Sequence, residues 1–524
     1  MCSSDLYYRR IDTRTRNDDL NEGSLDQSVY QPNAAERAAL TAAGYSGFPL
    51  AGESARNTPF PFWRCIANVL LRDEPGEKCN ALINRSHTMQ QNYGAAGQAT
   101  FSGMFGGRQH KLTAGAALDL SRMQFGQSTQ LAYLNPDRSV TALDAYADGV
   151  TGGNVDGTPF DNRVDLGART QSISGYVADV MPLGEAWHLS ASGRYQTTSL
   201  RNRDQINPGG GARSLDGDHR FSRFNPAIGV TYAPDAATSG WAGINQGSRV
   251  PTAIELGCAN PLQPCRLPNA MAGDPPLKQV ITRTVELGAR GNLSGSVRWT
   301  ASVFRAENHD DILFVAAPNR TQFGFFRNVG LTRREGAEVA LRGRVGRIEA
   351  GLQYSLVNAT FRTEETLNGT ANSSNDTATS GAGAGLDGNI RVRPGDRIPL
   401  VPRRQMKLHA DWRATERLGM GGQFVAVGSA YARGNENNQH QPDGSVYPGA
   451  GKSPGYALVN LNAQYQVDAA LRFIGQVSNV FDRRYATAAQ LGPMGFTAGG
   501  NFIARALPRS EEHTSELQSR LHLV

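Results

Sequence analysis

Four of the five cysteines form two close pairs, which is the most distinctive spacing of reactive side chains in this sequence. Cys65 pairs with Cys79 and Cys258 with Cys265, and each pair lies in a segment whose Pro and polar content indicates a surface loop. In an oxidising compartment such pairs form disulfides. Buried free thiols are disfavoured in Pro-rich loops, and zinc is the weaker alternative because neither pair has CxxC spacing or a nearby histidine. Cys2 is left over.

The remaining residue types that could do chemistry show no constellation. His87, His110, His309 and His440 are scattered along the chain, and we interpret them as solvated loop histidines rather than haem or metal ligands. We expect no GxSxG hydrolase site, no HExxH zinc site and no comparable constellation of catalytic residues. The sequence therefore predicts no catalytic residues, no metal and no cofactor.

The composition restricts the elements that can carry these residues. Only 39% of the chain is hydrophobic, yet it has 20 Phe, 16 Tyr and 5 Trp, too many for a solvated coil. No apolar run reaches the ~18 residues that a membrane-spanning helix needs. A closed β-barrel needs apolar side chains only at every second position, so it fits a polar average. The net charge of +6 is dispersed, which disfavours nucleic-acid binding.

Alternation with period two is the strongest local pattern. In 459–465, Val, Leu, Ala and Tyr alternate with Asn, Asn and Gln, and 187–195, 337–342 and 408–413 alternate in the same way. Burying these charged side chains in the core of a soluble protein would cost too much free energy. They are acceptable if their face of the strand lines the lumen of a barrel and the apolar face meets lipid. The soluble alternatives are a β-sandwich and a propeller. Aromatic residues near strand ends and the alternation of short turns with long loops disfavour both. A propeller would also show a repeat of about 40 to 50 residues, and we find none.

The pattern predicts fifteen strands and a doubtful sixteenth at 501–507. They lie near 6–13, 91–104, 110–124, 164–181, 187–203, 219–233, 239–248, 281–291, 297–309, 328–343, 346–361, 404–414, 418–431, 455–467 and 471–480. Bacterial single-chain barrels have even strand counts, so either the chain is truncated or one strand is misread.

Five long loops are predicted between these strands, in contrast to the short turns. They cover 14–90, 129–163, 249–280, 362–403 and 432–454. We expect the loop at 362–403, which is rich in Asn, Ser, Thr, Gly and Ala, to be mobile, because nothing in it can pack.

Four motifs, in order along this background, resemble TonB-dependent receptors. Gly247-Ser-Arg249-Val-Pro251, continuing to Glu255-Leu256, is similar to the family's Gly-Phe-Arg-Ala-Pro and Glu-Leu. Three further motifs resemble the family's Glu-x-Gly-x-Lys/Arg, Asn-x-Gly and Asn-Leu-Phe-Asp-Lys-x-Tyr; they are carried by Glu286, Gly288 and Arg290, by Asn328 and Gly330, and by Asn479, Phe481, Asp482 and Tyr485. We interpret all four as structural signals, and the resemblance covers about residues 7–508.

The resemblance implies an all-β fold, an antiparallel transmembrane β-barrel in the outer membrane of a Gram-negative bacterium. The family's barrels have 22 strands, a plug domain and a short box that binds the energising partner, whereas we find about 15–16 strands and neither plug nor box. We expect residues 7–508 to be a partial barrel, and 1–6 and 509–524 to be foreign sequence from cloning or sequencing adapters.

The implied function is uptake of a scarce ligand such as a ferric siderophore, driven by the TonB–ExbB–ExbD complex. Outer-membrane lipid and lipopolysaccharide are the implied surroundings. By residue type, four loop residues could hold an anionic siderophore complex: Tyr146, Arg249, Arg320 and Tyr431. A passive porin is the alternative, and a barrel enzyme ranks below it.

Overall fold

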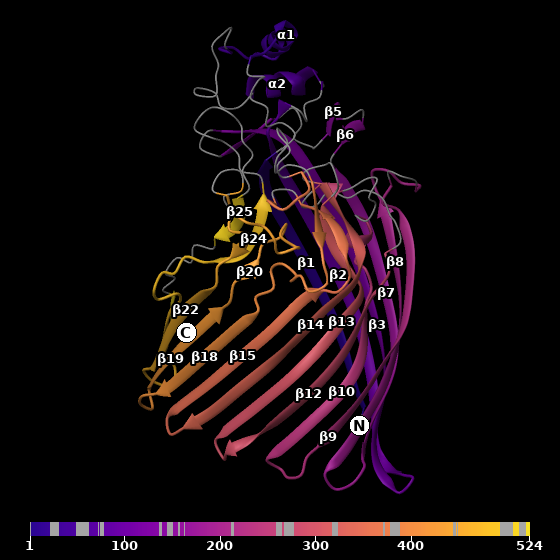
Figure 1. Cartoon of the computed structure of the whole chain (residues 1–524), viewed down its shortest axis with the longest axis vertical. Helices are drawn as coiled ribbons and strands as arrows, with labels where there is room; N and C mark the ends of the chain where they lie inside the picture. The colour runs from indigo at the N-terminus through magenta and orange to yellow at the C-terminus, as the bar shows by residue number, and fades with distance from the viewer. Residues whose placement is uncertain are drawn as a thin grey trace.

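The computed structural model is nearly all β (Figure 1). It describes residues 2–20, 31–48, 62–71, 73, 78–135, 139–143, 150–155, 158–161, 163–210, 214–257, 265–266, 277–316, 323–369, 372–377, 388–443, 447, 449–492, 507–512 and 520–523.

One antiparallel sheet dominates these residues. It contains 18 strands, of which β4 (Val140–Ala142), β11 (Cys265–Arg266) and β26 (Arg520–Leu523) are short. The other 15 (18 − 3) each pair with the next one along the chain. They are β1 (Cys2–Leu20), β2 (Ala81–Phe105), β3 (Arg108–Leu134), β7 (Val164–Pro182), β8 (Trp187–Asp204), β9 (Gly217–Tyr232), β10 (Thr238–Arg249), β12 (Val280–Ser294), β13 (Val297–Ala316), β14 (Phe323–Val345), β15 (Ile348–Phe361), β18 (Arg404–Arg413), β19 (Leu418–Val427), β22 (Tyr456–Gln466) and β23 (Arg472–Val477). Each contains most of one predicted strand, so the predicted fold class is confirmed.

The sheet has a turn end and a loop end. Tight hairpins such as Gly106-Gly107, where both residues adopt positive φ, close the turn end at the bottom of Figure 1. The described parts of the long connections, for example 31–48 and 62–71, lie at the loop end, at the top of the same view. This asymmetry is typical of membrane barrels.

Contacts of the short helix α4 (Ala253–Leu256) identify the inner face of the sheet. The helix contacts both β8 and β14, which are separated by four strands, so it lies on the concave side. The Asn202 side chain donates to Ala253 O at 3.2 Å. Asn202 and Leu200 therefore face inward and Arg201 faces outward, and the pairing register extends this assignment to the neighbouring strands.

Toward the turn end, the outer face is apolar. Large apolar side chains are about half exposed there, for example Val177, Phe224 and Ile244, while inward neighbours such as Asp119 are polar. This apolar belt is the surface that lipid would cover. On β3 it extends from Leu112 to Leu120, and the next outward residue is Arg122. With the usual strand rise and a tilt of about 40°, the height from Leu112 to Arg122 is about 25 Å, which suits a bilayer core.

Toward the loop end, the polarity of the two faces is inverted. Phe125 and Leu166 now point inward and are buried together with Leu215, while Arg122 and Arg169 point outward. Water replaces lipid on the outside, and packed loop segments replace water on the inside. This inversion marks the level at which the wall leaves the membrane.

The predicted loops at 14–90 and 129–163 were too long, because strands extend into them. β1 continues to Leu20, β2 begins at Ala81 and β3 continues to Leu134. At 81–83 both faces of β2 are buried, Ala81 and Ile83 in one cluster and Leu82 in another. All three residues are therefore apolar, and the alternation of apolar with polar residues is lost. Short elements also occupy the loops: α1 (Ala34–Ala42), α2 (Phe62–Leu71), β5 (Val150–Val155), β6 (Thr158–Asp161), β20 (Ala430–Tyr431), β21 (Lys452–Ser453), β24 (Ala486–Gly492) and β25 (Leu507–Glu512).

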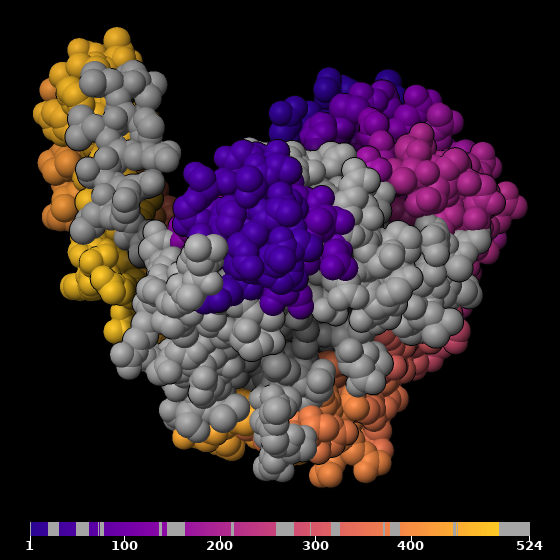
Figure 2. Space-filling model, turned by 90° about the horizontal axis from the view of Figure 1, so that it is seen from above, coloured from indigo at the N-terminus to yellow at the C-terminus, as the bar shows by residue number. Residues whose placement is uncertain are grey.

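The α1–α2 segment forms a small folded cap at the loop end. A buried glutamate, Glu36, joins the two helices: it accepts from Arg64 at 2.9 and 3.0 Å and from Asn68 at 3.1 Å. The predicted disulfide between Cys65 and Cys79 is confirmed, and both cysteines are buried. Seen from the loop end, the indigo atoms of this cap lie over the middle of the molecule (Figure 2).

Candidate binding site at the loop end

Two loops at the loop end pack against each other into a polar core. Within 362–403, the strands β16 (Glu365–Asn368) and β17 (Asn389–Val392) pair, and Leu367, Ile390 and Ile398 are buried with Phe361. The expectation that nothing in this loop can pack was therefore wrong for its described part. Four residues per strand are too few to show alternation beside a low-complexity run.

Buried asparagines connect this loop to the loop at 432–454. Asn372 is fully buried, and its side chain donates to Gly434 O at 2.8 Å. Asn438 has positive φ, accepts from Arg397 N at 2.7 Å and donates to Arg397 O at 3.0 Å. Because amide side chains both donate and accept, they satisfy backbone groups that loops would otherwise leave unpaired.

His440 lies at the centre of this junction. Its Nδ1 accepts from Ser373 N at 3.1 Å, so its Nε2 carries the proton and donates to Gly449 O at 2.9 Å. Burial lowers the pKa of His440, which keeps the ring neutral. The interpretation of His440 as a solvated loop histidine was wrong. His87, His110 and His309 are not loop residues either, since they lie in strands β2, β3 and β13. The predicted strands 110–124 and 297–309 already contained His110 and His309.

Tyr431, one of the predicted ligand-binding residues, lies close to two cations beside this junction. The Arg397 guanidinium carbon is 5.4 Å from the centre of the Tyr431 ring, and Lys452 Nζ is 4.4 Å from it. Arg397 Nε is buried with no hydrogen-bond partner. We call Arg397, Tyr431 and Lys452 the cationic cluster. Two cations and a phenol suit an anionic aromatic or carboxylate-bearing ligand.

Arg249, another predicted ligand-binding residue, is engaged in a structural contact. Its guanidinium donates to both oxygens of Glu255, at 3.1 and 2.8 Å. Glu255 also accepts from Thr252 N, and the Glu255 backbone N–H donates to the Thr252 side chain, so the two residues form the capping box that starts α4. Pro251 and Leu256 are buried. The Gly247 to Leu256 motif thus turns the chain inward at the end of β10. Arg249 and Tyr431 belong to separate contact networks.

Several predictions fall outside the described residues. Tyr146, Arg320 and Cys258 are among them, so neither the pairing of Cys258 with Cys265 nor the predicted roles of these loop residues is tested. Cys265 lies in β11, which pairs with β14.

The remaining family motifs lie at strand ends and at close contacts. Trp241 donates to Glu286 at 3.2 Å, and its ring covers Gly288, where an added Cβ would meet it at 2.2 Å. Arg290 donates to Ser239 at 3.1 Å. Asn328 accepts from Lys278 N at 2.8 Å and donates to Asp310 O at 2.8 Å. Gly330 lies close to the Thr363 side chain.

The last motif forms a turn after β23. Asn479 and Asp482 both adopt positive φ, and the Asn479 side chain accepts from Arg483 N and donates to Arg483 O, each at 3.0 Å. Phe481 is exposed, and the Tyr485 ring lies 4.5 Å from that of Tyr456.

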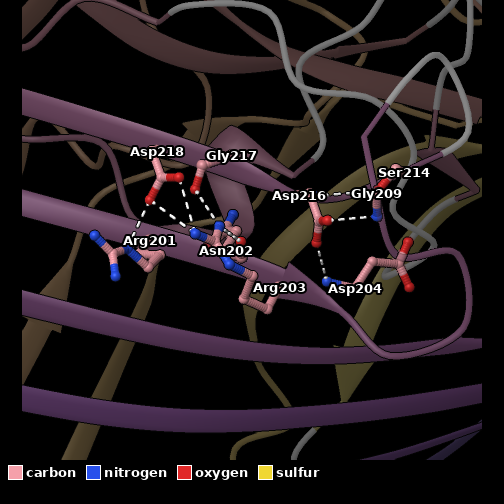
Figure 3. Close-up of polar contacts among 9 residues, drawn as sticks. All are labelled: Arg201, Asn202, Arg203, Asp204, Gly209, Ser214, Asp216, Gly217 and Asp218. Carbon is pink, nitrogen blue, oxygen red and sulfur yellow. Dashed lines mark hydrogen bonds and ion pairs between the residues drawn. The ribbon is translucent and has the colours of Figure 1, made fainter.

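An aspartate network between β8 and β9 was missed by the sequence reading (Figure 3). Asp204 accepts from the backbone of Ile206, Asn207 and Leu215. Asp216 accepts from Asp204 N at 2.6 Å and Gly209 N at 2.8 Å, and these two bonds lower the pKa of Asp216. The run Asn-Pro-Gly-Gly-Gly at 207–211 was the available turn signal.

One serine has the spacing of a hydrolase nucleophile but not its setting. Gly451-Lys-Ser453-Pro-Gly455 matches G-x-S-x-G, which in hydrolases connects a strand to a helix. Here Ser453 is buried in the two-residue strand β21, and its hydroxyl donates to Ala430 O.

Within the described ranges, no three His, Cys, Asp or Glu side chains gather closely enough to hold a metal ion. The described helices are all too short or too polar to cross a membrane.

Comparison with known proteins supports the reading of the fold. Residues 4–480 match the family model of the TonB dependent receptor-like β-barrel. The ferrienterobactin receptor of Escherichia coli K12 is 31% identical over 112 residues, which are 21% of this chain and 15% of that protein.

Two solved structures show the same fold. The siderophore receptor PiuA from Acinetobacter baumannii has a TM-score of 0.53 at 14% identity, over 82% of this chain and 60% of that one. The ferric citrate transporter FecA has a TM-score of 0.52 at 14% identity, over 84% and 55%. The chain therefore spans less than two thirds of the length of each of these proteins.

Proposed function

The chain belongs to the TonB-dependent receptor-like β-barrel family, and from that premise we propose that it takes up a ferric siderophore through the outer membrane. Members of this family are receptors rather than enzymes, and their location is the outer membrane of a Gram-negative bacterium. We propose the TonB complex, with ExbB and ExbD, as the source of energy, since ligand import by this family is coupled to it.

The cationic cluster is the observation that carries the choice of ligand class. Many siderophore complexes of Fe³⁺ are anions with aromatic or carboxylate groups. The Arg397 guanidinium and the Lys452 ammonium group supply positive charge within 5.4 Å of the centre of the Tyr431 ring. The packed loops keep this cluster in place, so that little ordering entropy is lost on binding.

Direct binding measurements test this proposal. The folded chain in detergent is titrated with ferric complexes of a catecholate, a hydroxamate and citrate, and quenching of protein fluorescence is followed. We expect one class to bind, and we expect Arg397→Gln and Lys452→Gln each to weaken it about tenfold, the effect of losing one charge-assisted contact. Arg342→Gln, which removes a pair with Glu349 in the barrel wall, is the matched control. Equal affinity in all variants would contradict the assignment.

A passive porin remains the rival function. It would share the barrel but would not need a loop-end site for a ligand. Uptake of the iron-loaded siderophore by cells that carry the receptor, with and without TonB, separates the two functions. The proposal predicts that uptake is lost without TonB, whereas a porin would keep the same uptake in both kinds of cell.

A further inference from the structure

A small cavity lies at the loop end of β18, β19 and β22, on the inner face of the wall. Its volume is about 190 Å³. Three of its lining residues, Gln405, Val427 and Tyr456, lie directly opposite one another in the pairing register and therefore share a face of the sheet. Following the register from β8 to β18 shows that this is the inner face.

The two-stranded ribbon of β20 and β21 separates this cavity from the cationic cluster. Within the ribbon, Lys452 lies directly opposite Tyr431, and both belong to the cationic cluster. The next residue, Ser453, lines the cavity. Successive residues of a strand point to opposite faces, so the cluster and the cavity lie on opposite faces of the ribbon. We call the cavity the ribbon cavity, and we treat it as a separate site.

Contacts of the backbone hold the walls of the ribbon cavity in place. Leu400, which lines it, adopts a left-handed conformation (φ 63°) that costs free energy in a residue other than glycine. The Leu400 N–H donates to Tyr431 O at 2.9 Å, which fixes this conformation to the ribbon. Gly455 approaches the Val427 carbonyl so closely that an added Cβ would lie 2.9 Å from the oxygen. A cavity with fixed walls loses little ordering entropy when a ligand binds.

The lining of the ribbon cavity is polar but uncharged. None of the described residues that line it carries a charge. Three carry hydroxyl groups and one carries a carboxamide: Ser453, Tyr456, Thr487 and Gln405. The Ser453 hydroxyl is buried and donates to Ala430 O at 3.4 Å, so its oxygen can still accept a hydrogen bond. A charged ligand would lose its hydration without gaining an opposite charge, whereas hydroxyl groups can both donate to and accept from this lining.

We propose that the ribbon cavity binds one uncharged, hydroxyl-rich molecule of the size of a single sugar ring. The volume of the cavity equals that of about six water molecules in the liquid. Pockets for drug-sized ligands begin at about 300 Å³, so a whole ferric siderophore complex is too large. A sugar also has C–H groups that pack on aromatic rings. The Tyr456 ring, which lies 4.5 Å from the Tyr485 ring, supplies such a surface.

Saturation-transfer NMR of added sugars tests the proposal on the folded chain. The chain is kept in lauryldimethylamine oxide, because a detergent with a sugar headgroup would compete for the cavity. Glucose, galactose and mannose are titrated, each beside its 2-amino analogue, in which an ammonium group replaces one hydroxyl. We expect at least one of the three sugars to bind saturably, and its amino analogue to bind at least about tenfold more weakly. Saturable binding of no sugar, or equal binding of the amino analogue, would overturn the proposal.

Variants of the lining connect this binding to the ribbon cavity. Ser453→Ala and Thr487→Val each remove one hydroxyl group and should weaken sugar binding about fivefold, the effect of one lost hydrogen bond. Thr487→Ser keeps the hydroxyl and should retain the affinity. Thr284→Val, in β12 and four strands away from β18, is the matched control and should change the affinity by less than about twofold. Undiminished affinity in both lining variants, or an equal loss in the control, would contradict the proposal.

Thermal unfolding separates loss of binding from misfolding. Without sugar, Thr487→Val and the unsubstituted chain should unfold at the same temperature. Sugar at about ten times its Kd should then raise the unfolding temperature of the unsubstituted chain more than that of Thr487→Val. Equal stabilisation of the two proteins would overturn the proposal. Ferric siderophore binding should be unchanged in Thr487→Val, because the cationic cluster lies on the other face of the ribbon, so the proposed function and this inference can fail independently.

Discussion

Ser373 donates its backbone N–H to Nδ1 of His440 at 3.1 Å, and this bond joins two loops 67 residues apart in the chain. A backbone N–H can only donate, so the bond exists only while Nδ1 is unprotonated. The groups around the ring are its Nε2 partner Gly449 O, the Tyr447 ring at 6.0 Å, and Asp443, whose charge raises the pKa. Burial outweighs Asp443, and the pKa of His440 is lowered overall.

Acid should therefore open the junction between the two loops. The native state binds the proton less readily than the unfolded state, so the stabilisation is complete above about pH 6.5 and declines as the pH falls toward the lowered native pKa. Hydrogen exchange at Ser373, corrected for the intrinsic rate, should accelerate between pH 8 and pH 5.5. His440→Asn keeps an acceptor near the Nδ1 position and does not titrate, so the acceleration should vanish in it. Equal pH dependence in both proteins would refute this account.

Loss of the Arg249 guanidinium should destabilise the end of β10. Glu255 is mostly buried and would keep its charge with only backbone donors, so Arg249→Gln should cost about 1 kcal/mol of unfolding free energy. Urea unfolding of the chain in lipid vesicles measures the difference. Arg391→Gln is the control because Arg391 and Glu364 are both well exposed, and it should change stability by less than about 0.5 kcal/mol. A larger effect of the control would show that burial is not the cause.

The cap should unfold separately from the barrel when its buried glutamate is neutralised. Glu36→Gln removes the acceptor charge that faces Arg64 and Asn68, and breaking a buried pair costs about 3 kcal/mol. Limited proteolysis should then cut the α1–α2 segment while the strands stay protected. Reduction of the Cys65–Cys79 disulfide should have the same local effect. Glu364→Gln, on the surface, should leave the cap resistant, and an equally resistant Glu36 variant would contradict the proposed role of the buried charge.

Gly288 should tolerate no side chain under the Trp241 ring. A Cβ at Gly288 would lie 2.2 Å from the ring, so Gly288→Ala must displace Trp241 and its bond to Glu286, at about 1 to 3 kcal/mol. Tryptophan fluorescence and the urea midpoint should both change. Gly247→Ala, in the adjacent strand β10, meets nothing within 4 Å and should be nearly neutral. Two variants of equal stability would show that the ring is not fixed.

The strands could be predicted from the sequence because lipid selects one face of each. At 187–195, for example, a belt residue must be apolar while its neighbours face polar surroundings, which produces a period of two. The pattern stops after Tyr195, since the next outward residues of β8 are Thr197, Ser199 and Arg201. Beyond that level both faces can be buried, as at 81–83, and the sequence signal disappears.

The loop-end site was less predictable, since its contacts join distant segments. Tyr431 was selected by residue type. Arg397 and Lys452 are distant from it in the sequence and come close to its ring only in the folded protein, so the sequence did not predict these contacts. Arg249 was selected in the same way and proved to be paired with Glu255 six residues away. Asn372 and His440 showed no local pattern because their partners are more than 60 residues away in the chain.

Spin labels placed along β8 test the central claim, that the outer face of these strands meets lipid, most directly. Labels from 189 to 203, in lipid bilayers, are probed with oxygen, which partitions into lipid, and with a polar nickel complex, which stays in water. We predict high oxygen accessibility at odd positions such as Ala191 and Gly193 and low accessibility at even positions such as Ser192, with the oxygen preference lost at Arg201. Uniform accessibility along the strand, or a lipid signal that continues through Arg201 and Arg203, would contradict the account.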